Sequence, residues 1–515
     1  MAAAPGLVLG LLLFLWEAGA QLRFANYYGD HMVLQKEPSR AVVWGYGIPG
    51  ANISVTVFQT HNVMIKEAAK VHAVTKVWKV LLSPMPQGGP YSLELRQSYK
   101  QEVSNVTLND VYFGDVWLCS GQSNMEMTVS QIFNASQELA EAIQYPLVRV
   151  FAAALVESDE ELEELEAINL QWSVPTAENL GHGDFSYFSA VCWLFGRHLF
   201  DTLQYPIGLI DSTWGGTPIE AWSSKRALQE CGISTDLKRN ISLYRIAGPK
   251  DSSVLWNSMI HPFINMTLHG VIWYQGEENT VMNTDLYNCT FPSLIEDWRK
   301  GFHKGSKGQT QRYFPFGFVQ LCTNRNVVQN DSFPRIRWHQ TADYGYVPNT
   351  KMPNTFMAVT IDLGDENSPY GSIHPRDKQT VAYRLHLGAL AVAYGKKFLV
   401  YQGPYPQMVQ VDADHELINV TYNEPIVLRQ LDNKIFEACC SEQEACKWSP
   451  VQLKSSLYQS VFLHNKVCPK AVTGLRYAWT EWPCKYMLCP IYNLQSLPAP
   501  PFVTFAKNNP AWTVS

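Results

Sequence analysis

The sequence predicts an α/β domain built on a mostly parallel sheet, with a β-rich domain on each side of it. Between residues 110 and 397, near-continuous apolar runs alternate with helical stretches, the pattern of a parallel sheet covered on both faces. Before and after this part, short β-type runs are separated by turn signals. We therefore expect domains over 21–109, 110–397 and 398–515, and a length of 515 residues fits about three domains.

The composition is that of a globular protein. Hydrophobic residues make up 46% and charged residues 17%, which excludes global disorder. The 40 basic and 46 acidic residues give a net charge of -6, and no basic stripe is present, so a nucleic-acid partner is not expected. Nothing in the sequence fixes an oligomeric state.

Residues 1–20 are typical of a secretory signal peptide. An apolar run of eleven residues, Gly6 to Trp16, is too short to span a bilayer, which needs about 20 residues. Ala18-Gly19-Ala20 follows as a small-residue cleavage site. Because no Lys or Arg precedes the run, a buried helix or a membrane anchor is the alternative. No later stretch is long and apolar enough to cross a membrane, so we expect a lysosomal or secreted protein.

Glycosylation motifs and cysteines agree with that compartment. Eight Asn-x-Ser/Thr sequons are candidate glycosylation sites: Asn52, Asn105, Asn134, Asn240, Asn265, Asn288, Asn330 and Asn419. Six of the eleven cysteines lie in the last quarter of the chain, which predicts two or three disulfides in the C-terminal domain. Their spacing does not fit a zinc site, and the odd total leaves at least one thiol free or in an intermolecular bridge.

The individual elements follow from periodicity. In the first domain, Ile53, Val55 and Val57 alternate with polar residues and predict a strand of a small β-sandwich or open sheet. In the middle domain, helical spacing predicts a helix over 190–203. The strands expected there span 116–119, 147–151, 207–210, 271–274, 316–321 and 356–361.

Four of these strands run into polar loops that could carry chemistry. Ser120 and Ser123 follow the first, where a helix N-terminus favours a developing negative charge. The paired glycines Gly215 and Gly216 follow another and can present backbone N–H donors. Each loop alone also has a plain structural explanation, such as helix capping or a tight turn.

The other two loops supply an amide and a base. Gln275 and Asn279 follow the strand at 271–274 and could donate to an oxyanion, and His374 lies in an acidic loop after the strand at 356–361. Because strand ends of a parallel sheet meet at one edge, the four loops together predict a site for acyl transfer. No Gly-x-Ser-x-Gly, His-Glu-x-x-His or Walker motif occurs, and no metal or cofactor is expected.

Four motifs make the resemblance specific. They are Gly121-Gln-Ser-Asn-Met125, Trp214-Gly-Gly-Thr-Pro-Ile-Glu-Ala-Trp222, Trp273-Tyr-Gln-Gly-Glu277 and Ile373-His-Pro375. They resemble the successive blocks of the SGNH hydrolase superfamily, and in particular its sialate O-acetylesterase branch. The resemblance covers nearly the whole chain after residue 20 and implies an SGNH-type three-layer domain.

The resemblance implies that Ser123 is the nucleophile and His374 the base. It also implies an oxyanion hole made of backbone N–H groups of Ser123 and of Gly215 or Gly216, with the side chain of Gln275 or Asn279. One departure concerns the acid that usually stands three residues before the histidine, since that position is Gly371 here. Either an acid at 362, 365 or 366 or a backbone carbonyl would then orient the imidazole.

A second departure is Glu278, which stands where the branch commonly has Ser and adds an acid near the site. The implied activity is hydrolysis of O-acetyl esters of sialic acids, with 9-O-acetyl preferred. Arg376 is the candidate partner of the sialate carboxylate, and Trp214 is a candidate stacking surface. The alternatives are an acetylesterase acting on neutral glycans and a glycan-binding protein with an inactive hydrolase domain.

Overall fold

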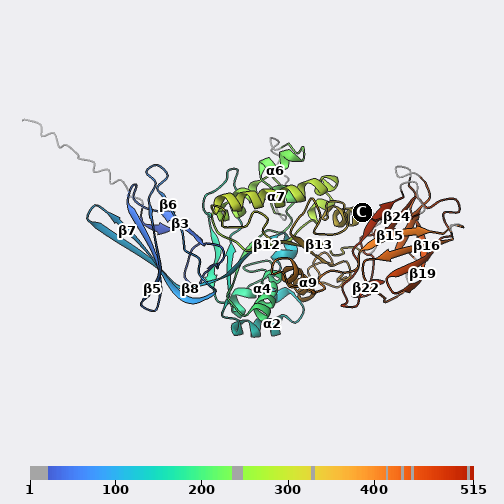
Figure 1. Ribbon diagram of the computed structural model, residues 1–515, viewed down its shortest axis with the longest axis horizontal. Coiled ribbons are helices and arrows are strands. Elements are labelled where there is room, and N and C mark those ends of the chain that lie inside the picture. Colours follow the sequence, from blue (N-terminus) through green and yellow to red (C-terminus); the bar gives the residue numbers. More distant parts are fainter. Residues whose placement is uncertain are drawn as a thin grey trace, which may run out of the picture.

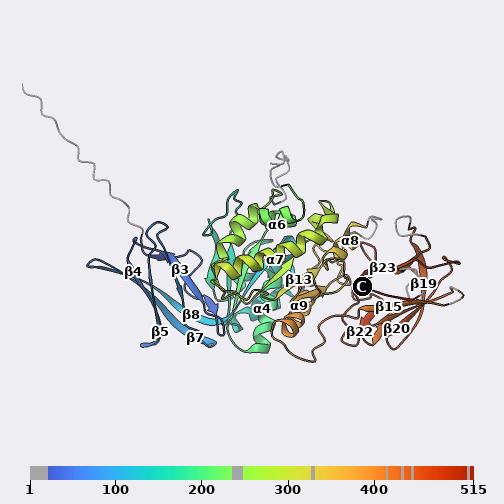
Figure 2. The ribbon, with the colours of Figure 1, turned by 45° about the horizontal axis from the view of Figure 1, so that its top comes forward.

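The computed structural model describes residues 21–234, 248–325, 331–412, 414, 416–430, 434–441, 446–506 and 511–514. An α/β region lies between two β-rich regions along the long axis (Figure 1), and the same order is visible after a turn of 45° (Figure 2). This confirms the coarse fold class predicted from the sequence. The expected signal peptide over 1–20 lies outside the described residues.

The N-terminal region consists of strands alone. Its strands are β1 (Arg23–Phe24), β2 (Val33–Gln35), β3 (Val42–Tyr46), β4 (Asn52–Gln59), β5 (Asn62–Lys70), β6 (Val77–Leu81), β7 (Gly88–Tyr99) and β8 (Glu102–Gly121). Residues Ile53, Val55 and Val57 of β4 are buried, as their alternation predicted. They pack into the hydrophobic core.

Strand β8 joins this region to the next. Its first part pairs antiparallel with β7, and its last part pairs parallel with β11 (Ile207–Thr213) and β12 (Gly270–Tyr274). The boundary expected between residues 109 and 110 therefore falls inside one continuous strand of 20 residues. A strand that begins in the N-terminal sheet thus ends two residues before Ser123.

The central sheet has the order β10-β9-β11-β8-β12-β13-β14. Its remaining strands are β9 (Val148–Ala153), β10 (Ile168–Ser173), β13 (Phe316–Gln320) and β14 (Thr355–Val359). All neighbours run parallel except β10, an antiparallel edge strand that the sequence did not predict. Every residue of β9, β11, β12, β13 and β14 is buried, which explains why these strands are mostly apolar.

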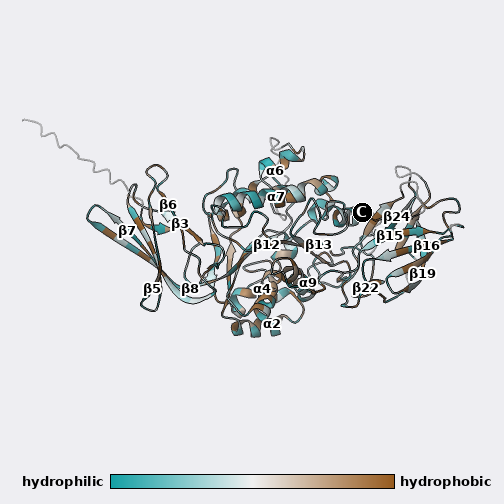
Figure 3. Ribbon diagram, viewed as in Figure 1, coloured by the Kyte–Doolittle hydropathy of each residue, from teal (hydrophilic) through white to brown (hydrophobic). Residues whose placement is uncertain are grey.

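Helices lie on both sides of this sheet (Figure 1). Helix α4 (Ala190–Leu203) spans the predicted range and packs against α9 (Lys378–Val392) on one side. Helices α6 (Lys225–Glu230) and α7 (Tyr287–Gly305) lie on the other, and α7 carries both teal and brown segments in the hydropathy view (Figure 3). The shorter α-helices are α1 (Ser123–Glu126), α2 (Ala135–Glu141), α3 (Ala177–Leu180), α5 (Ile219–Trp222) and α8 (Ser332–His339).

Short 3-10 and π turns complete the helical structure of this region. They are η1 (Val129–Gln131), η2 (Ala142–Gln144), η3 (Trp256–Ile260), η4 (His261–Phe263), η5 (Glu278–Thr280) and η6 (Thr284–Leu286).

The C-terminal region forms an eight-stranded sheet of order β23-β21-β18-β19-β20-β16-β15-β24 and a two-stranded sheet of β17 with β22. The strands are β15 (Pro406–Val411), β16 (Leu417–Tyr422), β17 (Ile426–Leu428), β18 (Phe436–Cys439), β19 (Ser449–Leu457), β20 (Ser460–His464), β21 (Gly474–Tyr477), β22 (Ile491–Asn493), β23 (Phe502–Phe505) and β24 (Ala511–Thr513). This region is β-rich, as the sequence predicted.

Five disulfides cross-link the chain. Three lie in the C-terminal region, as expected, and join Cys439 to Cys446, Cys440 to Cys468 and Cys484 to Cys489. Two others join Cys119 to Cys192 and Cys231 to Cys289. The odd cysteine is Cys322, whose thiol is free and buried.

Two features are absent from the described residues. Within them, no helix has both the length and the apolar character needed to cross a bilayer. In the same part of the chain, no group of three or more His, Cys, Asp or Glu side chains is arranged to hold a metal ion.

Candidate active site

The candidate nucleophile lies at the carboxyl end of β8. The strand ends at Gly121, and Ser123 is the first residue of α1. Gly121 has a φ of +144°, and a Cβ on it would lie 2.1 Å from the carbonyl oxygen of Tyr274. Only glycine therefore lets the ends of β8 and β12 approach this closely, and this approach brings Ser123 to the edge of the sheet.

The candidate base contacts this serine directly. His374 Nε2 lies 2.8 Å from Ser123 Oγ, although 251 residues separate the two along the chain. The other ring nitrogen, Nδ1, lies 2.7 Å from the backbone carbonyl oxygen of Tyr370. A carbonyl can only accept, so Nδ1 carries the proton and Nε2 is left to accept the hydroxyl proton of Ser123.

The environment of His374 keeps the imidazole neutral. Burial lowers its pKa below the ordinary value of 6.5, and the nearby Lys378 ammonium lowers it further, while the Tyr370 carbonyl acts in the opposite direction. The edge of Phe185 packs against the imidazole with ring centroids 5.2 Å apart. A neutral, oriented imidazole is the form that a general base needs.

The three acids considered for orienting the imidazole have other positions. Asp362 forms a buried bidentate pair with Arg384, at 2.6 and 2.9 Å. Asp365 pairs with Arg376 at 2.6 Å, and Glu366 is exposed. Among the described residues the only partner of His374 Nδ1 is therefore a backbone carbonyl, one of the alternatives that the sequence left open.

The glycine pair lies beside the nucleophile. A Cβ built on Gly215 would lie 3.2 Å from Ser123 Cβ. The N–H of Gly215 already donates to Glu126 Oε2 at 2.7 Å, whereas the N–H of Gly216 has no acceptor in the described part of the chain. Gly216 also has a φ of +68°, which turns its peptide away from a regular strand.

Burial changes the charge state of Glu126. It raises the pKa of this carboxyl to about 7, although the hydrogen bond from Gly215 acts in the opposite direction. Glu126 could not be singled out from the sequence, because its contact with the turn at Gly215 forms only in the folded chain.

The two amides expected in the oxyanion hole are hydrogen-bonded to other groups. Gln275 Nε2 donates to the Thr217 carbonyl at 3.2 Å and to Asn279 Oδ1 at 2.8 Å. Asn279 Nδ2 donates to Glu220 Oε2 at 3.0 Å and to the Met282 carbonyl at 3.1 Å. Since an amide has only two N–H groups, neither side chain has a donor left for an oxyanion in this arrangement. The pattern of the loop indicated their polarity, but their partners depend on the fold.

A buried polar network behind the nucleophile was also missed. Asn124 Nδ2 donates to Glu277 Oε1 at 2.6 Å and to the Ile373 carbonyl at 2.8 Å, and its Oδ1 accepts from Lys378 Nζ at 2.7 Å. Burial lowers the pKa of Lys378 to about 8. Asn124 follows Ser123 in the chain and Ile373 precedes His374, so this hydrogen bond links the two segments that carry the dyad. The motif Gly-Gln-Ser-Asn-Met contains this asparagine and was the available signal.

The candidate substrate-binding residues differ in their exposure and in the partners that they already have. Arg376 pairs with Asp365 through its Nε and one Nη, and its side chain is 28% exposed. Trp214 is half-buried beside Gly215, so its ring remains accessible in part. Trp222 and Trp273, by contrast, are completely buried and belong to the core.

Glu278, the departure noted in the third motif, forms an ion pair with Lys250. The Lys250 Nζ also donates to the Gly216 carbonyl at 2.7 Å. The Lys250 ammonium thus binds a carbonyl of the glycine turn, whereas Glu126 accepts an N–H of the same turn. The positive charge of Lys250 compensates the negative charge of Glu278.

The sequons divide by exposure. Asn52, Asn105 and Asn134 are exposed, while Asn265 and Asn419 are half-buried. Asn288 lies within α7, and its Nδ2 donates to Asp343 Oδ2 at 2.5 Å, so a glycan there would require this contact to break. Asn240 and Asn330 lie outside the described residues.

Comparison with known proteins identifies the family. Residues 113–368 match the family model described as carbohydrate esterase, sialic acid-specific acetylesterase, and residues 407–506 match the sialate O-acetylesterase C-terminal domain. The human sialate O-acetylesterase is 56% identical over 509 residues, covering 98% of this chain and 97% of the relative. The chain belongs to the sialate O-acetylesterase family.

Other members and a solved structure agree. The mouse sialate O-acetylesterase is 52% identical, covering 97% of this chain and 98% of its own. A crystal structure of a carbohydrate acetylesterase from Xanthomonas citri superposes with a TM-score of 0.77 at 28% identity, covering 94% of this chain and 99% of that one. The resemblance stated from four short motifs is therefore confirmed for the family as a whole.

Proposed function

We propose that this protein is a serine esterase that hydrolyses O-acetyl esters of sialic acids, with 9-O-acetyl groups preferred. One observation carries the proposal: Ser123 Oγ, His374 Nε2 and the Tyr370 carbonyl form a continuous hydrogen-bonded chain, with contacts of 2.8 and 2.7 Å. Membership of the sialate O-acetylesterase family supports the substrate class.

The reaction proceeds in two steps. Ser123 Oγ attacks the acetyl carbonyl carbon while its proton moves to His374 Nε2, and a tetrahedral oxyanion forms. The bond from the acetyl carbon to the sugar oxygen then breaks, and the imidazolium returns the proton to that oxygen. Water, deprotonated by the same imidazole, attacks the acetyl-enzyme and releases acetate and free Ser123.

The oxyanion is stabilised by backbone donors. The N–H groups of Ser123 and Gly216 have no acceptor among the described residues. The N–H of Gly215 is bound by Glu126, and this hydrogen bond weakens when Glu126 is protonated, because a neutral carboxyl is a poorer acceptor than a carboxylate. Each such donor is typically worth about 3 kcal/mol in the transition state. Gln275 and Asn279 act indirectly, by holding the loops that carry these donors.

We propose that a cation and an aromatic surface near the dyad recognise the sugar. Arg376 lies two residues after the base, and its side chain is 28% exposed beside its partner Asp365, which suits a contact with the sialate carboxylate. Trp214, half-buried beside the glycine turn, is the stacking surface for the sugar ring.

The finer fold and location belong to the same proposal. We infer an SGNH-type three-layer domain over 110–397 with β-rich domains over 21–109 and 398–515. Five disulfides are consistent with the secretory pathway, and we infer a lysosomal or secreted protein. Exposed sequons at Asn52, Asn105 and Asn134 are the glycosylation sites that this location favours.

Acetate release from 9-O-acetylated N-acetylneuraminic acid tests the function. Ser123→Ala and His374→Ala are expected to lose activity by at least about a thousandfold, because each removes one half of the dyad. Ser120→Ala is the matched control, since Ser120 Oγ is buried and has no partner among the residues that the structure describes, and its loss should leave the rate within about threefold.

Two results would overturn parts of the proposal. Cleavage of acetylated xylan but not of the sialic acid would retain the catalytic dyad and replace the substrate by a neutral glycan. Folded wild-type protein that is inert on both sugars and on 4-nitrophenyl acetate would make the domain a binding module.

A further inference from the structure

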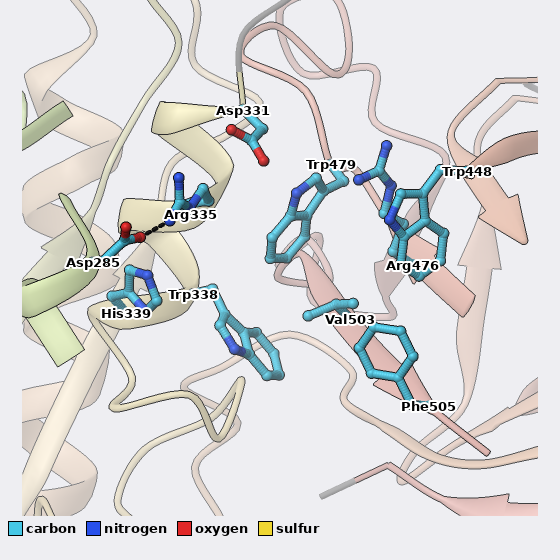
Figure 4. A pocket seen from close by; sticks show the side chains of 10 residues that line it. All are labelled: Asp285, Asp331, Arg335, Trp338, His339, Trp448, Arg476, Trp479, Val503 and Phe505. Atoms are coloured by element: carbon cyan, nitrogen blue, oxygen red, sulfur yellow. Dashed lines mark ion pairs between the residues drawn. The ribbon is translucent and has the colours of Figure 1, made fainter. Parts of the chain in front are cut away.

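A cleft between α8 and the C-terminal sheet lies outside the active site. It has a volume of about 270 Å³, close to the lower end of the roughly 300–1,000 Å³ typical of small-molecule sites. One wall is formed by α8 and the preceding turn, and the other by the ends of β19 and β21 with the edge strand β23 (Figure 4). The lining residues are Asp285, Asp331, Arg335, Trp338, His339, Trp448, Arg476, Trp479, Val503 and Phe505.

Aromatic side chains dominate this cleft and remain partly exposed. Trp338, Trp448, Trp479 and Phe505 are all half-buried, so no described part of the chain covers them. Trp338 and Trp479 face each other from the two walls, with ring centroids 6.2 Å apart and planes at 61° (Figure 4). Leaving three indole side chains half-exposed to water is unfavourable in free energy. Their ring faces can instead bind an apolar ligand or one rich in C–H groups.

The two walls are locked together by a buried arginine. Arg337, next to Trp338 on α8, is completely buried and donates to the carbonyls of Thr480 and Glu481 at 2.8 and 2.7 Å. Two further N–H groups donate to the carbonyls of Leu321 and Cys322. The segment after Trp479 is thus held to the esterase region, and the cleft cannot close by moving the two regions together.

Polar groups at the rim can bind hydroxyls. Arg335 pairs with Asp285 on the esterase side (Figure 4). Arg476 pairs with Glu437 at 2.7 Å on the sheet side. His339 is held by Asp343 at 2.6 Å, and its Nε2 is buried without a partner in the described chain. These groups form rigid donors and acceptors around the aromatic faces.

The charge balance selects the ligand class. Arg335 and Arg476 each have a carboxylate partner, Asp285 and Glu437, and Asp331 adds a third acid to the lining. Three carboxylates therefore face two guanidiniums and repel an acidic sugar, whereas the hydroxyls of an uncharged sugar can bind to paired groups without separating them. A pyranose ring has apolar C–H faces for the indoles and hydroxyls at its edge for the rim.

We propose that this cleft is a second carbohydrate site, which binds a neutral hexopyranose residue of a glycan. It goes beyond the esterase activity and does not depend on it, because none of its lining residues belongs to the catalytic dyad. The helix that bears Trp338 does reach the active-site loops, since Gln340 Nε2 donates to the Gln275 carbonyl at 3.2 Å. A glycan bound in the cleft would thus be held close to the active-site loops.

Lactose binding to the full-length protein tests the proposal. Saturation-transfer NMR should detect lactose with a Kd on the order of 1 mM, as expected for a small open site. Trp479→Ala should weaken binding by about tenfold or more, while leaving the rate on 4-nitrophenyl acetate and the melting temperature unchanged. Tyr458→Ala is the matched control, because Tyr458 is 70% exposed on the same region but lies outside the cleft.

A second variant guards against a folding defect. Val503→Trp, on the edge strand, adds bulk to the cleft instead of removing packing, and it too should abolish lactose binding. The proposal is overturned if the wild type shows no lactose binding up to ~20 mM. It is also overturned if Trp479→Ala binds lactose normally, or if N-acetylneuraminic acid binds here and lactose does not.

Discussion

Glu126 Oε2 accepts the backbone N–H of Gly215 at 2.7 Å, immediately beside Ser123. An ionised carboxylate at this point occupies a donor that the oxyanion needs and adds negative charge next to it. Burial raises the pKa of Glu126 to about 7, so the group changes charge near neutrality. The neighbouring acid Asp211 is also buried, and its pKa is raised to about 8.

We predict an acidic pH optimum that depends on Glu126. Activity should fall as the pH drops through the lowered pKa of His374, because the base becomes protonated, and should fall again as the pH rises through about 7, because Glu126 ionises. Glu126→Gln has no charge to gain and should lose the high-pH limb. The measurement is kcat/KM for 9-O-acetylated sialic acid between pH 4 and pH 9.

The same profile contains its control. Glu126→Gln should leave the low-pH limb where it is, since that limb belongs to His374. A wild-type profile that stays flat above pH 7, or a variant whose high-pH limb persists, would show that Glu126 does not compete with the oxyanion.

We predict that no carboxylate orients the base. Asp365→Asn should lower kcat by less than about tenfold, compared with the ~10⁴-fold loss seen where an acid holds the catalytic histidine. Tyr370→Phe should be nearly silent, because it retains the carbonyl that accepts from His374 Nδ1. Steady-state kinetics on one ester decide this, and a loss near 10⁴-fold in Asp365→Asn would restore the acid.

We predict that the Asp362–Arg384 pair is essential for stability. Both side chains are buried, and Asp362 Oδ2 also accepts from Tyr492 of the C-terminal region at 2.9 Å. Asp362→Ala leaves an unpaired buried guanidinium and should cost about 3–5 kcal/mol in urea unfolding. Lys300→Ala removes an exposed i,i+4 pair with Glu296 and should cost no more than about 0.5 kcal/mol. Equal effects would contradict this reading.

We predict that Gly121 cannot be replaced. In Gly121→Ala the new Cβ would meet the Tyr274 carbonyl, so the ends of β8 and β12 must separate and the Ser123–His374 contact must change. Gly50→Ala is the control: Gly50 also has a positive φ, +77°, but open space around it. Gly50→Ala should cost only the backbone strain of about 1–2 kcal/mol and retain activity, whereas Gly121→Ala should lose both stability and acetyl release.

We predict that Arg376 acts on substrate affinity. Arg376→Ala should raise KM for 9-O-acetylated sialic acid by about tenfold, the value of one charge-assisted contact, and leave 4-nitrophenyl acetate unaffected. Lys250→Ala is the comparison, since Lys250 is the cation that donates to the Gly216 carbonyl. If only Lys250→Ala raises KM for the sugar, the carboxylate lies on the side of the glycine turn.

Local patterns predicted much of the central region. Helix α4 has the bounds expected from its periodicity, and the runs that begin at Ile207, Val271 and Phe316 are buried parallel strands, because a strand buried on both faces must be apolar throughout. Strand β10 was missed, because an antiparallel edge strand has no such run. The boundary at residue 109 was placed inside β8, because the alternation of its first half changes to a solid apolar run without a break in the chain.

The sequence contains the chemical groups of the site in their order: a serine after one strand, glycines after the next, and a histidine before a proline, together sufficient to identify the family. Which of their atoms meet depends on the fold. His374 Nδ1 donates to the Tyr370 carbonyl and not to an acid, and Gly215 donates its N–H to Glu126. The Gln275 amide donates to Asn279 Oδ1. Hydrogen-bond partners depend on positions that strands and loops distant in the chain adopt together, and local composition contains no such information.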